Sequence, residues 1–348
     1  MSSTRTPSAA EQLDFLGKLQ RILNEGQFVA SYKYALMMSL AELCVEKTEK
    51  EDGTLHLSLQ EIAERLIALY WRQAAPFAGG QLLRHSSGRE ASAVSRIRAF
   101  QERVPTLSVA RRDRRWPALV QSICRLLVEM PLWRLQLVGA DRMEFLYKEE
   151  LVDGGILLRP DVARCFREQF PVVQALVQMA WLTFVQRLPA NQALLGSTGD
   201  LVDFLFGSQR SALKALVSGL RDIQHGDCFY CRTRMHDKVA VDHFIPWSRY
   251  PRDLEHNFVL AHDSCNLDKR DMLAAPRHLE RWVDRNTRDD IAVRQILNEA
   301  RFMHDLDASY TVAEWQYEMT QRVGGLVWVA KKGVTERLDA AWRDIVPA

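Results

Sequence analysis

The sequence reads CFYCRTRMHDKVAVDHFIPW from Cys228 onward and HDSCNLDK from His262 onward. Cys228 and Cys231 are separated by two residues, a spacing that lets both sulfur atoms reach one tetrahedral metal ion from a tight turn. His262 and Cys265 repeat that spacing. Together they form a Cys3His set with no open coordination position, which predicts a structural Zn²⁺ site. A redox role for the first pair is the alternative, but it leaves the second pair unexplained.

The residues between the two pairs favour regular secondary structure. The run of β-branched and apolar residues at 239–241 predicts a strand, and residues 257–261 predict a second one. Residues 266–272 then predict the start of a helix. The order strand, strand, helix therefore indicates a small α+β unit whose two ends are held together by zinc.

This segment resembles the HNH nuclease family, whose ββα-metal fold carries an Asp-His pair followed by Pro, a central Asn, and a closing Cys-Asn-x-x-Lys. The resemblance covers roughly residues 225–275. The matching residues are Asp242, His243, Pro246, Asn257, Cys265, Asn266 and Lys269. Two positions depart from many members: His262 stands where a zinc-binding cysteine is usual, and Asn266 stands in place of histidine, an alternative that the family also uses.

The resemblance implies a role for each catalytic position. Asp242 and Asn266 would hold one Mg²⁺ or Mn²⁺ ion, with water and the substrate phosphate as its other ligands. His243 would be the general base that takes a proton from the attacking water. Asn257 would orient His243 by fixing its loop. The catalytic ion would stabilise the scissile phosphate and the leaving 3' oxygen, while zinc serves only the architecture.

Basic residues that could bind phosphate lie in two places. Arg249, Lys269 and Arg270 flank the proposed site. The segment 84–115 holds nine arginines and three acidic residues, a net charge of +6 in a chain whose total is +2. Within that segment, the arginines that we expect to contact nucleic acid are Arg111, Arg112, Arg114 and Arg115. A solvated helix face is the alternative explanation of the same segment.

The chain as a whole has the composition of an ordinary folded protein. Its 348 residues are 47% apolar and 26% charged, which argues against disorder and favours more than one domain. Apolar residues recur at helical spacing through residues 12–71, 160–220 and beyond Pro276. The most apolar stretch, 171–185, is shorter than the ~20 residues of a membrane span and predicts a buried helix. We therefore expect no membrane partner.

Local signals refine this helical pattern. Ser58 and Glu61 have the spacing of a capping box, which predicts that a helix begins there. Alternating residues within 133–158 predict a short hairpin, which on a helical domain could form a winged helix. We find no internal repeat.

We therefore expect a mainly α protein with a small α+β unit. A helical domain that engages substrate or regulates the enzyme is expected at 1–222, the HNH ββα-metal nuclease unit at 223–275, and a helical C-terminal segment that packs on the others at 276–348. The N-terminus lacks the apolar run of a secretory signal, which favours the cytoplasm. Widely spaced Cys44, Cys124 and Cys165 agree, because they read as free thiols in helices.

The function implied by the resemblance is a metal-dependent DNA endonuclease that nicks or cuts both strands. A large helical body beside such a unit also resembles bacterial nucleases that defend against foreign DNA, often together with protein partners. One alternative is an RNase that uses the same centre, because attack by an external water needs no 2'-hydroxyl. Another is a zinc-stabilised module that binds nucleic acid without catalysis. We also hypothesise that the helical body or a missing partner restrains cutting.

Overall fold

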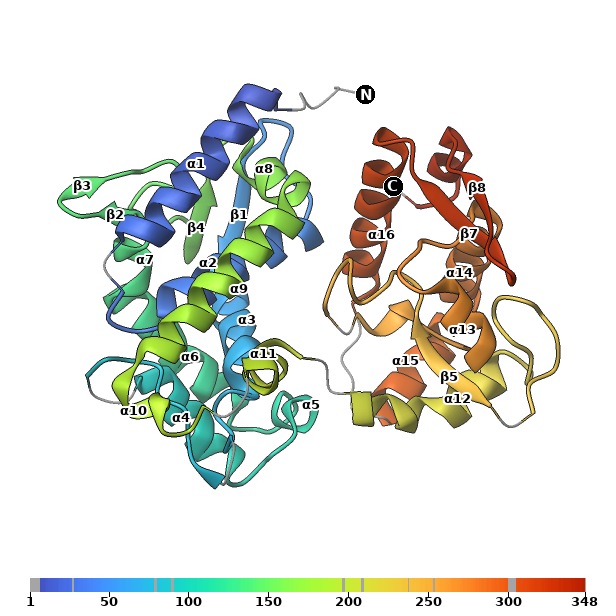
Figure 1. The fold of residues 1–348 in the computed structure, drawn as a ribbon, viewed down its shortest axis with the longest axis horizontal. Helices are drawn as coiled ribbons and strands as arrows, with labels where there is room; N and C mark the ends of the chain where they lie inside the picture. The colour runs from blue at the N-terminus through green and yellow to red at the C-terminus, as the bar shows by residue number, and fades with distance from the viewer. Residues whose placement is uncertain are drawn as a thin grey trace. The chain divides into compact units, whose positions relative to one another are not determined.

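The computed structural model describes residues 7–26, 28–77, 80–88, 91–195, 198–207, 210–236, 238–252, 254–299 and 305–347. The chain divides into two compact units, Met1–Gly207 and Ser208–Ala348 (Figure 1). Helices dominate both units, and each of the four sheets formed by the described residues has two strands. The expected mainly α protein with a small α+β unit is confirmed.

The first unit is built around one buried helix. Its helices are α1 (Ala9–Glu25), α2 (Tyr32–Glu46), α3 (Leu59–Trp71), α4 (Ser92–Gln101), α5 (Leu107–Ala110), α6 (Trp116–Glu129), α7 (Pro131–Arg134), α8 (Val162–Glu168), α9 (Phe170–Arg187), α10 (Pro189–Gln192) and α11 (Thr198–Phe206). All but one of the 15 residues of α2 are buried, against α3, α8 and α9 among others. Such enclosure explains why apolar residues occur on every side of α2, whose buried charged residues Glu42 and Glu46 pair with Arg65 of α3.

The apolar stretch 171–185 lies within α9, so the predicted helix is confirmed. Its residues Val173, Val177 and Trp181 are buried in the first unit. Within the part of the chain that the structure describes, every helix is too short or too polar to cross a lipid bilayer.

The predicted capping box at the start of α3 is present. The Ser58 hydroxyl accepts a hydrogen bond from the backbone N–H of Glu61, and the Glu61 carboxylate accepts one from the backbone N–H of Ser58. Just before this cap, β1 (Leu55–Ser58) pairs antiparallel with β4 (Gly155–Leu158). Sequence periodicity missed this sheet because each strand has only four residues and its partner is far away along the chain.

The hairpin expected within 133–158 is shorter than predicted. Its strands β2 (Leu137–Val138) and β3 (Asp141–Arg142) pair across Gly139, which has a φ of +60°. Two isolated antiparallel bridges, Tyr147 to Leu158 and Val152 to Gly155, follow later in the same range. Residues 143–146 form no strand. With two residue pairs, this hairpin gives the winged-helix suggestion no support.

A buried ion-pair network fixes the segment after α2. Glu49, whose side chain is 4% exposed, binds Arg164 and Arg167 of α8 through Oε1 and Oε2, both at 2.7 Å. Burial alone raises the pKa of Glu49, but the charges and hydrogen bonds of the two arginines outweigh it and lower the pKa to about 2. The ionised carboxylate therefore stabilises the folded state above pH ~4.5, and this contribution is lost as the pH falls towards 2.

We expect Glu49→Gln to destabilise the first unit by about 3 kcal/mol at pH 7, because two arginines lose their anionic partner. The difference from the unsubstituted protein should shrink as the pH falls from 5 to 3. Chemical denaturation, monitored by hydrogen exchange of the α2 and α8 amides, measures the free energy of unfolding of the first unit alone. Glu51→Gln, at an exposed position nearby, is the matched control. An equal loss of stability at pH 7 and pH 3 would contradict the linkage.

The second unit combines a strand pair with several helices. Its elements are η2 (Arg210–Leu216), α12 (Val217–Ile223), β5 (Val239–His243), η3 (Glu255–Asn257), β6 (Phe258–His262), α13 (Asp263–Lys269), α14 (Pro276–Arg288), α15 (Asp290–Glu299), α16 (Leu306–Arg322), β7 (Leu326–Ala330), β8 (Val334–Arg337) and η4 (Ala340–Asp344). β5 pairs antiparallel with β6, and α13 follows directly. The predicted order of two strands and a helix is confirmed.

The chain after α16 differs from expectation. Instead of a further helix, β7 and β8 form a hairpin around Lys332 and Gly333, which both have positive φ. The segment 334–337 had been expected to be helical. Two consecutive residues in the left-handed region make a tight reversal that periodicity does not register.

Candidate active site

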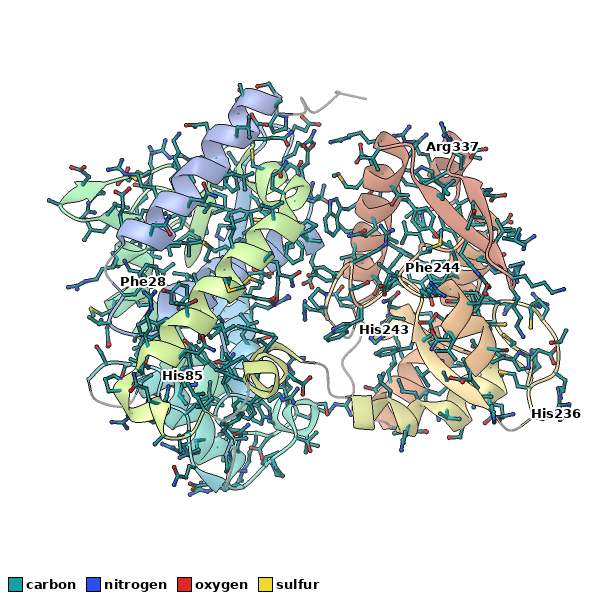
Figure 2. All side chains as sticks on the ribbon, in the orientation of Figure 1. Phe28, His85, His236, His243, Phe244 and Arg337 are labelled. Atoms are coloured by element: carbon teal, nitrogen blue, oxygen red, sulfur yellow. The ribbon has the colours of Figure 1, made fainter. Side chains whose placement is uncertain are left out.

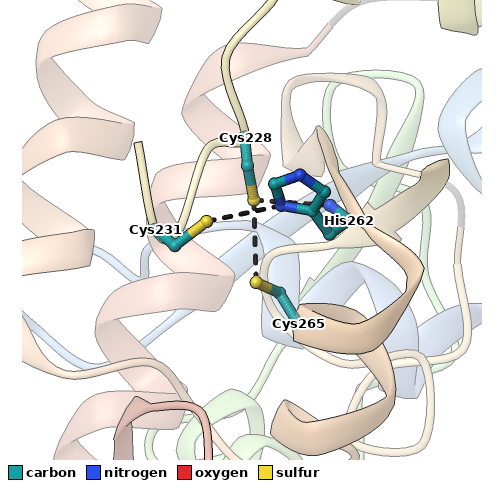
Figure 3. A group of neighbouring side chains, drawn as sticks. All are labelled: Cys228, Cys231, His262 and Cys265. Carbon is teal, nitrogen blue, oxygen red and sulfur yellow. Dashed lines mark hydrogen bonds between the residues drawn. The ribbon is translucent and has the colours of Figure 1, made fainter. Parts of the chain in front are cut away.

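Four side chains from two chain segments converge on one point (Figure 3). Cys228 and Cys231 lie in the turn after α12, whereas His262 ends β6 and Cys265 lies in the first turn of α13. Their ligand atoms all lie within 4.8 Å of one another. The Sγ atoms of Cys228 and Cys265 are 3.8 Å apart. Tetrahedral zinc with Zn–S bonds of ~2.3 Å places its sulfur ligands about 3.8 Å apart, so this set suits a metal ion such as zinc.

Hydrogen bonds prepare these ligands for a metal. Nε2 of His262 lies 3.2 Å from the carbonyl oxygen of Arg234, a contact that leaves the Nδ1 lone pair facing Cys231 Sγ at 3.3 Å. Hydrogen bonds from the Cys265 thiol and from backbone N–H groups, including that of His262, lower the pKa of Cys228, although burial opposes the shift. Thiolate is the form that binds metal.

The catalytic candidates Asp242 and His243 end strand β5. Asp242 is buried, with 8% of its surface exposed, and His243 is half-buried. Figure 2 labels His243 on the ribbon of the second unit. The His243 ring lies between two aromatic neighbours, with ring centroids 5.3 Å from Trp247 and 5.0 Å from Phe258. The end of β5 therefore carries a carboxylate and an imidazole on two consecutive residues.

One oxygen of Asp242 is already engaged. The Tyr230 hydroxyl donates to Oδ2 at 2.5 Å, and Nζ of Lys269 lies 3.0 Å from the same atom. No described residue hydrogen-bonds to Oδ1. That oxygen is therefore the one available to a cation.

Lys269 lies in the interior rather than at a phosphate-binding surface. Its side chain is fully buried, and besides Asp242 it donates to the carbonyl oxygen of His243 at 3.1 Å. The ammonium group thus ties helix α13 to the end of β5. The sequence did not indicate a role for Tyr230, because a tyrosine between two candidate metal ligands belongs to no catalytic motif. Tyr230 reaches Asp242 only because the turn of residues 228–231, called the zinc turn below, folds onto β5.

Asn257 holds the loop that follows His243. Its side chain is 2% exposed, accepts a hydrogen bond from the N–H of Ile245 at 2.7 Å and donates to the carbonyl oxygen of the same residue at 2.9 Å. The backbone N–H of Phe244 also donates to the Asn257 carbonyl oxygen at 2.7 Å. These three bonds fix the backbone directly after the imidazole.

Asn266 follows Cys265 of the metal-binding Cys3His cluster in α13 and is half-buried. Its side-chain amide has no hydrogen-bond partner among the described residues. The helix α13, which carries Asn266, packs against β5 and β6, and β5 carries Asp242. An uncommitted carboxylate oxygen and an uncommitted amide oxygen are the hard donors that Mg²⁺ or Mn²⁺ prefers.

The remaining arginines that the sequence predicted to contact nucleic acid differ in their exposure and in their partners. Arg249 donates to backbone and side chains of its own unit, including the Asp271 carbonyl oxygen at 2.8 Å, whereas Arg270 is exposed. In the first unit, Arg112 and Arg114 are exposed, while Arg111 and Arg115 are half-exposed. Arg115 forms a two-point contact with Asp113 at 2.8 and 2.7 Å. Two members of this charged segment, Arg89 and Glu90, lie outside the described residues.

Two protein-family models match the chain. One, described as a domain of unknown function (DUF8808), covers residues 11–205, and the other, described as HNH endonuclease, covers residues 228–271. No curated protein and no solved structure gives a significant match. The second match confirms the resemblance that the zinc ligands and the Asp-His pair suggested, and it indicates a nuclease or nucleic-acid-binding role.

Proposed function

Because the chain belongs to the DUF8808 family and carries an HNH endonuclease domain at residues 228–271, we propose that it is a metal-dependent endonuclease that hydrolyses phosphodiester bonds in DNA. The observation that carries the proposal is the end of β5. There Asp242 is held through one oxygen while the other stays uncommitted, and His243 follows on a backbone that Asn257 fixes. An inert module would need neither arrangement.

The chain's own residues divide the work. Zinc held by the Cys3His cluster would fix the turn that carries Tyr230 and the helix that carries Asn266. Asp242 Oδ1 and the Asn266 side-chain oxygen would hold Mg²⁺ or Mn²⁺, which when bound supplies positive charge to the scissile phosphate. His243 would accept a proton at a ring nitrogen from the attacking water. Asn257 would keep that ring in place.

We further propose that the first unit engages the substrate or regulates the nuclease, in a cytoplasmic enzyme directed against foreign DNA. Support for this wider role comes from the DUF8808 match, which covers a helical unit separate from the nuclease, and from the exposed Arg112 and Arg114 within it. Protein partners that control cutting belong to the same proposal.

Metal-dependent nicking of supercoiled plasmid tests the proposed function. The full chain should convert plasmid to nicked or linear DNA in Mg²⁺ or Mn²⁺ but not in a buffer free of divalent ions. Asn266→Ala should lower the rate about a hundredfold by removing a ligand of the catalytic ion, whereas Asn298→Ala, an exposed asparagine of α15, should leave it unchanged. Cutting of RNA alone would replace DNA as the substrate. A folded, zinc-loaded protein that cuts neither would leave only a binding role.

A further inference from the structure

A cavity of about 240 Å³ adjoins the zinc turn on a side that the proposed chemistry does not use. The end of α12, the turn itself and one face of α14 line it. Four arginines contribute to its wall: Arg232, Arg281, Arg285 and Arg288. Three of these recur on α14 at spacings of four and three residues, so they share one face of the helix. The acidic residues of the wall are Asp227 and Asp284.

The positive charge of this arginine pocket is poorly balanced. No described acidic residue forms an ion pair with Arg232, Arg281 or Arg285. Asp227 lies 3.7 Å from Arg234, a residue outside the pocket wall. Burial lowers the pKa of Arg281, and the neighbouring charge of Arg232 lowers it further. Arg288 pairs with Asp289 at 2.7 Å, so three of the four arginines line the pocket without an ion-pair partner among the described residues.

Arg285 shows the imbalance most clearly. It is 4% exposed, and its two terminal nitrogens donate to the carbonyl oxygens of Phe258 at 2.9 Å and His256 at 2.7 Å. Its Nε is buried without a hydrogen-bond partner among the described residues. Asp289 acts on Arg285 only from beyond ion-pair distance. A buried guanidinium that lacks both a contacting anion and one hydrogen bond is costly, and an oxyanion in the adjoining cavity would supply both.

We propose that the arginine pocket binds a phosphate group of a nucleic-acid strand, away from the bond that is cut. This inference rests on the proposed nuclease function and adds a second contact to it. Guanidinium groups recognise phosphate through paired, charge-assisted hydrogen bonds, which fits a wall of arginines better than it fits a neutral ligand. The pocket also lies near the proposed site, because Arg285 binds the carbonyl oxygens on both sides of Asn257, and Phe258 pairs with His243 in the strand pair. A nucleic-acid strand, as a polyanion, could reach both places.

A competing explanation is that Arg232 and Arg281 only balance the zinc site. Three thiolates and a neutral imidazole give a zinc complex a net charge of −1, and Arg281 donates to the carbonyl oxygens of Phe229 and Tyr230 within the zinc turn. The two explanations differ in what the arginines do to nucleic-acid binding and to zinc retention.

Salt-dependent DNA binding separates them. The His243→Ala protein, in a buffer without Mg²⁺, is titrated with a fluorescent short DNA duplex at several salt concentrations. Arg232→Asn suits the site, since residue 232 has a φ of +61° that asparagine tolerates; Arg281→Gln is the second variant. Each should weaken binding about tenfold and reduce the slope of log K against log salt concentration by about 0.9. Arg322→Gln, on α16 outside the pocket, should change neither.

Three results would overturn the proposal. One is an unchanged salt slope in both variants. Another is loss of zinc by either variant with no change in slope, which would assign the arginines to the zinc site. The third is stabilisation of the protein by a nucleoside monophosphate, dependent on Arg232, without any contribution of Arg232 to duplex binding. Because binding is measured without cleavage, a failure of the nuclease assay and a failure of this proposal remain distinct results.

Discussion

Replacing His243 with alanine is expected to slow metal-dependent plasmid nicking by about 10²- to 10⁴-fold, the usual contribution of a positioned general base. The variant loses the imidazole that would accept a proton from water while keeping Asp242 and Asn266 for the metal ion. Since the base acts in the chemical step, kcat should fall while KM stays within about threefold. Initial rates of nicking across a range of plasmid concentrations measure both constants.

His236→Ala provides the matched control, because His236 is an exposed histidine of the same unit with no role in the site. His243 directly precedes the residues that Asn257 anchors, so its replacement could disturb the local fold. Equal zinc content in both variants would show that this fold is intact. If His243→Ala nicks DNA as fast as His236→Ala does, the base is another group. A large rise in KM with unchanged kcat would instead make His243 a substrate-binding residue.

Cys265→Ser is expected to abolish zinc binding and unfold the region formed by β5, β6 and α13. Structural zinc contributes an apparent ~10–16 kcal/mol of binding free energy in zinc-finger peptides, which exceeds the total stability of many domains. The loss reaches the candidate active site directly, because Cys265 lies in the first turn of the helix that carries Asn266 and Lys269. Nicking should therefore disappear together with the zinc.

Zinc content per chain, hydrogen exchange and thermal denaturation check this result. The exchange of β5 and β6 amides should become fast, while α2 and α9 of the first unit stay protected. Cys124→Ser is the control, because Cys124 is a half-buried thiol of α6 in the first unit. A Cys265→Ser protein that keeps one zinc ion and slow exchange in β6 would show that the cluster does not hold the structural metal.

The parts of the fold that the sequence predicted are those encoded by local spacing. Two-residue gaps between metal ligands are visible in any sequence, and the four ligand atoms do converge. The cap formed by Ser58 and Glu61 is local in the same sense. By contrast, the sheet of β1 and β4 joins segments far apart, and four-residue strands carry too little periodicity to be recognised.

Within the site, the sequence indicated which residues take part, but it did not indicate how buried they are or which side chains they contact. Lys269 flanks the proposed site in the sequence and was therefore predicted to contact phosphate. Its burial depends on Asp242 and Tyr230, which come from two other segments of the chain. Contacts of this kind follow from the packing of α13 on β5, which no spacing rule contains.

The two hydrogen-bond donors on Asp242 Oδ2 bear on how the proposed nuclease would be activated. With one oxygen shared between a phenol and an ammonium group, the carboxylate offers a cation a single, partly neutralised donor, and a magnesium ion held by so few protein ligands keeps most of its hydration. The resting enzyme would then carry little of its catalytic ion. Substrate phosphate would complete the coordination shell, so the ion and the nucleic acid would assemble together, and cellular magnesium levels would govern the rate of cutting.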